Sequence, residues 1–189
     1  MLAELARDAP LGLIGPLGTS WPKCAGTLAC VAGGVGLPPL YLEIKEALAH
    51  GADPRQFVLI YGARTRGQLY LHEAIEALGV RTMLVTEDGS CGRRGRVDLP
   101  LRELLAAHRS DSLEIHACGP ERMLQVVGQL AEQAHQRCFA SLETFMGCGF
   151  GVCNACAVKV KDEARPLGFK YARCCRDGSI FDHARLMWS

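Results

Sequence analysis

The sequence has no long hydrophobic run, since no apolar stretch approaches the ~18 residues that a membrane-spanning helix needs. It also has little net charge, because 21 Lys and Arg stand against 20 Asp and Glu. No overall field therefore favours nucleic acid or an acidic membrane surface. Aromatic residues make up only 6% of the chain, which favours an α/β core rich in Ala, Leu and Val over an all-β protein. We expect a protein without membrane or nucleic-acid partners.

The start of the chain lacks a secretory signal, because residues 1–20 contain no basic start followed by an apolar run. Ten cysteines would suggest disulfides in a small exported domain, but nothing here suggests export. We therefore expect a cytoplasmic protein whose reduced thiols are available for a metal.

Three cysteines, Cys148, Cys153 and Cys156, lie within nine residues, and Cys174 and Cys175 follow as a pair. This C-x4-C-x2-C…C spacing is typical of plant-type [2Fe–2S] clusters, which thiolates hold. Glycines between the cysteines let the backbone wrap closely around an inorganic core and point amides at its sulfurs. The spacing alone leaves the fourth ligand open, because adjacent residues of an extended chain point to opposite sides.

A structural zinc site is the main alternative to a cluster. Such sites commonly use two C-x2-C pairs, and only one is present here. With zinc, or as a redox sensor, the four cysteines would make the chain a non-enzymatic module that docks to a partner. Colour discriminates the two hypotheses, because an oxidised two-iron cluster is brown-red and zinc is colourless.

A strand–turn–helix unit is predicted near the start of the chain. An apolar run from Thr27 to Ala32 indicates a buried strand, residues 33–36 read Gly-Gly-Val-Gly, and apolar residues then recur at helical spacing from Leu37 to Ala49. Such a turn lets a pyrophosphate approach backbone amides at a helix N-terminus. Because the turn departs from G-x-G-x-x-G, a tight turn without a ligand is the alternative.

Further predicted strands alternate with predicted helices. The strands cover residues 56–61, 81–86 and 113–118, and the helices cover 69–78, 99–108 and 121–136. This alternation predicts an α/β fold with a doubly wound parallel sheet, whose ligands bind at the carboxyl ends of the strands. The glycine-rich or charged segments 33–36, 62–66, 87–90 and 118–120 all stand at such ends, so we predict a nucleotide site there.

The chain is divided into three parts. Residues 1–22 are interpreted as an N-terminal segment and linker, 23–137 as the nucleotide-binding domain, and 138–189 as a small cluster-binding domain. The last part is expected to begin with a strand over 138–143 that leads into the cysteine loop. A hairpin strand over 156–161 and a short strand over 179–181 follow.

Three motifs, in this order, resemble the ferredoxin–NADP reductase superfamily: Gly33-Gly-Val-Gly-Leu-Pro-Pro39, Cys118-Gly-Pro-Glu-Arg-Met123 and the terminal cysteine loop. Residues 146–159 and 171–182 are very similar to the cluster segment of dihydroorotate dehydrogenase B electron-transfer subunits, and Gly15-Pro-Leu-Gly18 resembles their interdomain junction. The resemblance covers about residues 14–188. It implies an NAD-linked iron–sulfur oxidoreductase subunit of pyrimidine biosynthesis, with a ferredoxin reductase-like domain and a C-terminal [2Fe–2S] domain.

The resemblance also implies which residues hold the cofactors. The cofactor-binding residues are Gly33, Gly34, Gly36, Leu37, Pro38, Arg64, Glu87, Asp88, Cys118, Gly119 and Pro120. The metal ligands are Cys148, Cys153, Cys156 and Cys175, because the family aligns its last ligand with the second cysteine of the pair. Cys118 is expected near the nicotinamide C4 without being an obligatory nucleophile, and no residue is assigned a catalytic role.

The charged residues after two of the strands bear on the choice of nicotinamide. Glu87 and Asp88 would repel a 2′-phosphate and can accept hydrogen bonds from a free ribose hydroxyl, which favours NAD. Arg64 and Arg66 argue for NADP. A solvated charged loop is the alternative for all four.

A flavin must stand between the two predicted sites, because a nicotinamide gives up two electrons at once and the cluster accepts one at a time. The family holds FAD mainly on an N-terminal β-barrel, whereas the first strand predicted here already begins at Thr27. We therefore expect a missing domain or a partner chain to hold FAD, and the chain alone to be inactive. The resemblance implies a hetero-oligomer with a catalytic, dihydroorotate dehydrogenase-like flavoprotein, although another oxidoreductase could be the acceptor.

Overall fold

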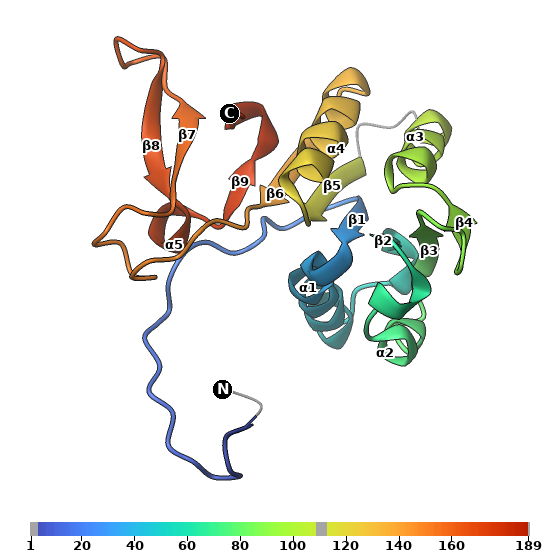
Figure 1. Cartoon of the computed structure of the whole chain (residues 1–189). Helices are drawn as coiled ribbons and strands as arrows, with labels where there is room; N and C mark the ends of the chain where they lie inside the picture. The colour runs from blue at the N-terminus through green and yellow to red at the C-terminus, as the bar shows by residue number, and fades with distance from the viewer. Residues whose placement is uncertain (1–3, 109–112, 189) are drawn as a thin grey trace.

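The computed structural model describes residues 4–108 and 113–188. Residues 1–3 of the predicted linker and residue 189 of the predicted cluster domain lie outside this description. Figure 1 shows an α/β body with a small β-rich lobe beside it. The strands are β1 (Thr27–Gly33), β2 (Phe57–Ala63), β3 (Arg81–Thr86), β4 (Arg93–Arg94), β5 (Leu113–Cys118), β6 (Arg137–Ser141), β7 (Ala157–Lys161), β8 (Phe169–Arg173) and β9 (Ile180–Asp182).

The described strands form a seven-stranded sheet in the order β4-β3-β2-β1-β5-β6-β9 and a separate β7–β8 hairpin. All neighbours in the large sheet are parallel except β6 and β9. Gly33 pairs with Gly62 of β2, and Ala32 pairs with Cys118 of β5. The predicted parallel sheet is confirmed, and the predicted bounds of β3 and β5 agree with the structure.

Helices cover both faces of the sheet (Figure 1). They are α1 (Leu37–Ala49), α2 (His72–Glu76), α3 (Asp98–Ala107), α4 (Glu121–Gln133) and the short α5 (Cys174–Asp177). Leu40 and Ile44 of α1 pack with Leu59 of β2 on one face, whereas Leu101 of α3 and Leu124 of α4 join the core of the other. The strand residues alternate between these two cores, as a doubly wound sheet requires. No helix in the described ranges is long and apolar enough to cross a membrane.

The helix predicted over 69–78 is shorter than expected, because α2 begins only at His72. The interruption is Leu71, which adopts a left-handed conformation with φ of 56° that an α-helix cannot contain. The residue before it is held by the buried phenol of Tyr61, whose hydroxyl accepts a hydrogen bond from the Tyr70 amide at 3.0 Å and lies 3.1 Å from the Gly34 carbonyl oxygen. A buried hydroxyl needs such partners.

The strand that begins the predicted cluster domain belongs to the large sheet. β6 pairs with β5 in parallel, and β9, which follows the last cysteines, returns antiparallel to β6. The Leu142 amide donates to the Ser179 carbonyl at 2.9 Å, so the two ends of the cluster segment are hydrogen-bonded to each other. The sequence did not predict β4, β8 or this return to the sheet. The division at 137/138 stays an interpretation.

A buried polar network holds the linker on the sheet. The His116 ring is fully buried, with Nδ1 2.6 Å from a Glu43 oxygen and Nε2 3.0 Å from a Glu114 oxygen. Trp21 stacks on this ring at 4.6 Å between centroids, and Arg137 pairs with Glu114 at 3.2 Å. Burial raises the pKa of Glu43. The linker is thereby fixed at its last residues.

The C-terminal segment packs on α4 through a glycine. The His183 imidazole lies against Gly128, where a Cβ would overlap the ring, and the Trp188 indole donates to His183 Nε2 at 3.0 Å. This contact fastens the residues after β9 to the helix beside β6.

We predict that Gly128→Ala lowers the free energy of unfolding by about 1–3 kcal/mol, because the added methyl forces His183 out of its place. Denaturant unfolding followed by circular dichroism measures the change. Gln129→Ala, on the exposed face of the same helix, is the control and should stay within about 0.5 kcal/mol. Equal stability of Gly128→Ala and the control would contradict this packing.

Candidate functional site

Two strand-end turns touch each other at the carboxyl edge of the sheet. β1 ends at Gly33, a 3₁₀ turn spans Gly34–Gly36, and α1 begins at once. A Cβ at Gly36 would overlap the Cys118 carbonyl, and one at Gly119 would lie 3.1 Å from Gly33 Cα. Glycine is therefore required by close backbone approach, as in turns that bring amides to a phosphate.

The residues around these turns complete a concave edge. A Cβ at Gly33 would lie 2.6 Å from the Met123 sulfur and 3.0 Å from Pro120 Cδ. The first turn of α1 contains no acidic residue, whereas α4 has Glu121 there. The positive end of α1 therefore suits an anion better than that of α4. Met123 ends the Cys118–Met123 motif but was assigned no role, and Tyr61 was not singled out. Met123 packs against Gly33 and Gly119, and the Tyr61 hydroxyl donates to the Gly34 carbonyl.

The charged residues predicted to read the ribose lie two strands away on the same edge. The Asp88 amide donates to the Arg64 carbonyl at 3.2 Å, so the ends of β2 and β3 are joined. The Asp88 carboxylate accepts from the Ser90 hydroxyl at 2.6 Å and the Ser90 amide at 2.9 Å, and these bonds lower its pKa. Glu87 faces Arg96 at 3.5 Å. Glu87, Asp88 and Arg64 are thus brought together.

Cys118 lies at the centre of this edge and is 4% exposed. Burial raises the pKa of its thiol to about 11, although the Ser141 side chain beside it acts in the opposite direction. A thiol with this pKa stays protonated near neutrality and is a poor nucleophile. Cys118 is thus buried at the strand end, and its place beside the nicotinamide stays a prediction.

Backbone amides surround the first two cysteines of the loop. The Val152 amide donates to Cys148 Sγ at 3.2 Å, the Cys153 amide donates to the same sulfur at 3.4 Å, and the Cys148 amide donates to Cys153 Sγ at 3.3 Å. Backbone hydrogen bonds from Cys153, Phe150 and Val152 lower the pKa of Cys148 to about 6. This environment favours thiolate, the form that binds iron.

The other thiolates form a second pair. Cys156 Sγ lies 3.3 Å from Cys175 Sγ, too far for a disulfide, and both side chains are buried. Cys174 and Cys175 open α5 rather than lying in an extended chain, and Cys174 is 1% exposed. Burial raises the pKa of Cys174. The structure thus pairs Cys175, not Cys174, with Cys156.

The two pairs suit two metal atoms rather than one. Tetrahedral zinc needs four ligands converging on one point. The thiols stand as two pairs, Cys148 with Cys153 and Cys156 with Cys175, and backbone amides point at the sulfurs of the first pair. This arrangement fits a [2Fe–2S] cluster in which each iron takes two thiolates.

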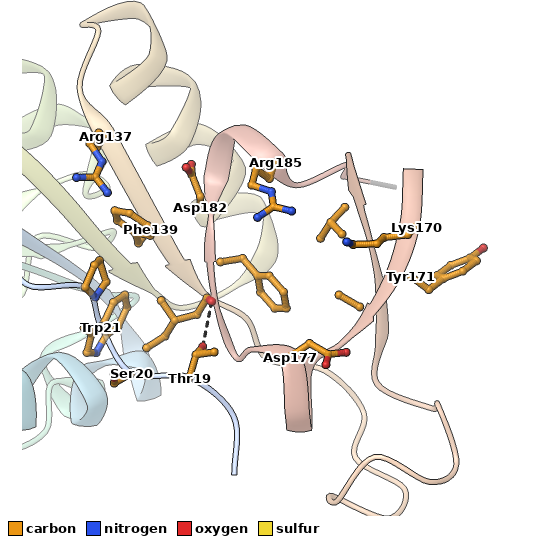
Figure 2. Close-up of a pocket in the computed structure, with 15 residues that line it drawn as sticks. Thr19, Ser20, Trp21, Arg137, Phe139, Lys170, Tyr171, Asp177, Asp182 and Arg185 are labelled. Carbon is orange, nitrogen blue, oxygen red and sulfur yellow. Dashed lines mark hydrogen bonds between the residues drawn. The ribbon is translucent and has the colours of Figure 1, made fainter. Parts of the chain in front are cut away.

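Two pockets lie near these residues. One of about 330 Å³ has Gly119 and Glu121 on one wall and Thr144 and Val158 on the other, so it adjoins both the strand edge and the cluster segment. Another, of about 780 Å³, lies between the linker, β6, β9 and β8 (Figure 2). The residues that line the larger pocket include none of the predicted site residues.

Comparison with known families gives two matches along the chain. Residues 30–129 match the family described as oxidoreductase NAD-binding domain. Residues 143–187 match the iron–sulfur cluster binding domain of dihydroorotate dehydrogenase B. The boundary between the two matches falls near β6.

Curated relatives cover nearly the whole chain. The chain is 38% identical over 186 residues to the probable dihydroorotate dehydrogenase B (NAD(+)) electron transfer subunit of Thermococcus kodakarensis, covering 98% of this chain and 71% of the relative. It is 32% identical over 181 residues to the corresponding subunit of Caldanaerobacter subterraneus, covering 95% and 67%. Against the Pyrococcus furiosus relative, at 35% identity, the chain spans 66% of the relative's length.

Among solved structures, an NADH-dependent reduced ferredoxin–NADP oxidoreductase superposes with a TM-score of 0.78 at 26% identity. The match covers 98% of this chain and 63% of that chain. The fold therefore extends over both parts of the molecule, the nucleotide-binding sheet and the cysteine-bearing lobe.

We predict that Cys175→Ala abolishes cluster binding whereas Cys174→Ala retains it, because only Cys175 faces the Cys156 sulfur. The measurement is iron per chain and visible absorption after anaerobic purification. Cys174→Ala should lose about 1 kcal/mol of stability as a small buried truncation and keep the colour. Loss of iron from Cys174→Ala alone would reverse the assignment.

We predict that Gly36→Ala weakens NADH binding at least tenfold, about 1.4 kcal/mol, because its methyl would overlap the Cys118 carbonyl and displace the turn. Titration followed by nicotinamide fluorescence measures the affinity. Gly67→Ala is the matched control, since its Cβ meets nothing closer than 3.8 Å. An unchanged affinity in Gly36→Ala would place the nucleotide elsewhere.

Proposed function

The chain belongs to the family of dihydroorotate dehydrogenase B electron transfer subunits, and on this premise we propose that it passes electrons between NAD(H), a flavin and a [2Fe–2S] cluster. One observation carries the proposal: a glycine-lined strand edge and two thiol pairs, the first of them faced by backbone amides, are built on the same sheet. When bound, the nicotinamide supplies a hydride, the flavin converts it into single electrons and the cluster carries them one at a time.

The proposed nucleotide site uses the strand edge. The Gly33–Gly36 turn and the N-terminus of α1, with Leu37 and Pro38, receive the pyrophosphate. Glu87 and Asp88 accept hydrogen bonds from the adenosine ribose, and Arg64 lies beside them. The segment from Cys118 to Pro120 lines the nicotinamide pocket. We therefore favour NADH over NADPH as the nucleotide, because the two carboxylates oppose a 2′-phosphate.

The proposed cluster ligands are Cys148, Cys153, Cys156 and Cys175. The first pair receives hydrogen bonds from loop amides, whereas the second pair, which includes Cys175 of α5, is buried. Amides aimed at the sulfurs offset the negative charge of four thiolates and so ease the uptake of an electron.

FAD is proposed to be held by a further domain or by a partner chain. The curated relatives are longer than this chain. Leu11, Leu13 and Ile14, within the N-terminal segment, are 55%, 85% and 74% exposed. Neighbouring apolar side chains this exposed indicate a surface that another domain or chain covers. The Trp21–His116 stack fixes the point at which the linker meets the sheet.

The acceptor is proposed to be a catalytic flavoprotein subunit, dihydroorotate dehydrogenase-like, in a hetero-oligomer. Exposed apolar side chains flank the thiolate loop: Phe145 is 79% exposed, Val152 70% and Phe150 47%. An apolar surface next to the cluster suits a docked partner, because burying it would exclude water and bring the acceptor close to the thiolates.

The test is reduction of the anaerobically purified chain, followed by its visible absorption. We predict that dithionite bleaches the cluster absorption, whereas NADH leaves this absorption unchanged in the absence of flavin. We also predict that the chain binds NADH about tenfold more tightly than NADPH. Iron-free protein that tightly retains zinc would contradict the electron-transfer role and favour a structural module. Bleaching by NADH in flavin-free protein would contradict only the need for a flavin.

A further inference from the structure

Arg173 connects two segments that carry predicted cluster ligands: the loop with Cys148 and Cys153, and the turn with Cys175. It is the last residue of β8 and directly precedes α5, the turn that carries Cys175. Its backbone amide donates to Asp177 Oδ2 at 2.8 Å, and its Nε lies 3.4 Å from the same oxygen. The Asp177 carboxylate, whose pKa these contacts lower, therefore holds the guanidinium in one orientation.

The other end of the guanidinium reaches the first cysteine loop. Arg173 Nη1 donates to the Gly151 carbonyl oxygen at 2.9 Å, across 22 residues of sequence. Gly151 adopts a φ of 91°, a conformation that favours glycine. A planar fork that donates in two directions can hold two segments at a fixed spacing, which a lysine ammonium does less well.

The peptide that Arg173 binds is the same peptide that faces the Cys148 sulfur. Its carbonyl oxygen belongs to Gly151, and its N–H belongs to Val152, which donates to Cys148 Sγ at 3.2 Å. The two groups of a trans peptide point in opposite directions, so a donor on the oxygen side orients the N–H toward the sulfur. A cation on the carbonyl also polarises the peptide and strengthens that N–H as a donor.

We propose that Arg173 is a positioning residue for the cluster: it orients the Gly151–Val152 peptide toward the Cys148 thiolate and fixes this loop to the turn that carries Cys175. The inference rests on the proposed cluster site and adds a residue that the cysteine spacing does not reveal. Arg173 touches neither a thiolate nor a reacting atom, so it acts through the peptide. Its positive charge also favours the reduced cluster, which carries one more electron.

A neighbouring arginine provides a matched control. Arg176 follows Cys175 on α5, and its Cδ would lie 3.2 Å from a Cβ at Gly151, so its aliphatic stem lies along the same loop and it carries the same charge as Arg173. In the described part of the chain it donates no hydrogen bond to the loop. Replacing Arg176 therefore removes charge alone, whereas replacing Arg173 removes charge and the hydrogen bond together.

The experiment compares Arg173→Gln, Arg173→Lys and Arg176→Gln as anaerobically purified, cluster-loaded chains. The first readout is the rate at which visible absorption is lost in an iron chelator, and the second is the midpoint potential of the cluster. We expect Arg173→Gln to lose its cluster about tenfold faster than the wild type, as for a hydrogen bond to a charged group, and to have a lower potential.

Arg173→Lys should also lose its cluster faster, while its potential falls less because the charge is kept. Arg176→Gln should lose its cluster within about twofold of the wild-type rate, since fixed loop geometry rather than charge governs retention. Circular dichroism checks folding, and if Arg173→Gln does not fold, Arg173→Lys decides by the same readouts.

Cluster loss from Arg173→Gln or Arg173→Lys at the wild-type rate would overturn the inference and leave the proposed function standing. Equal acceleration in Arg176→Gln would also overturn it, because charge alone would then explain retention. A wild-type chain that binds no iron would instead contradict the proposed function itself.

Discussion

The antiparallel pairing of β6 with β9 is the constraint on which the rest of the molecule depends. Strand β6 lies beside β5, which carries Cys118 at its end, and β9 returns to β6 after the last cysteines. The Leu142–Ser179 hydrogen bond closes the segment between them into a loop with fixed ends. A short segment with little core of its own is thereby anchored to a rigid sheet. The cysteine segment is consequently attached to the same sheet that carries the glycine-lined strand edge.

Both sites rely on backbone groups more than on charged side chains. At the strand edge, Gly36 and Gly119 permit backbone contacts that any Cβ would prevent. In the cysteine loop, amides of Val152 and Cys153 meet the Cys148 sulfur. Amide donors carry no net charge, so they can stabilise a pyrophosphate or a thiolate without being neutralised by an ion pair. This explains why glycine, rather than lysine or arginine, marks both sites in the sequence.

Sequence patterns predicted those features that depend on residues close together in the chain. The spacing of apolar residues predicted the bounds of α1, β3 and β5, and the cysteine spacing predicted a cluster-binding loop. The register of Ile180–Asp182 against β6 could not be predicted, because three residues carry no pattern that names a partner about forty residues away. Likewise, α2 begins late because Leu71 is left-handed, beside a Tyr70 amide that donates to the distant Tyr61 phenol, and the Arg173 contact with Gly151 spans 22 residues. Each is a tertiary interaction that overrides local propensity.

The buried polar network around His116 holds the end of the linker in position. The His116 ring lies at hydrogen-bond distance from the carboxylates of Glu43 and Glu114, and Arg137 faces Glu114 at 3.2 Å. Buried ionic sets add little net stability but tolerate few alternative geometries. The stacked Trp21 is therefore held in one place, which fixes the end of the linker just ahead of β1.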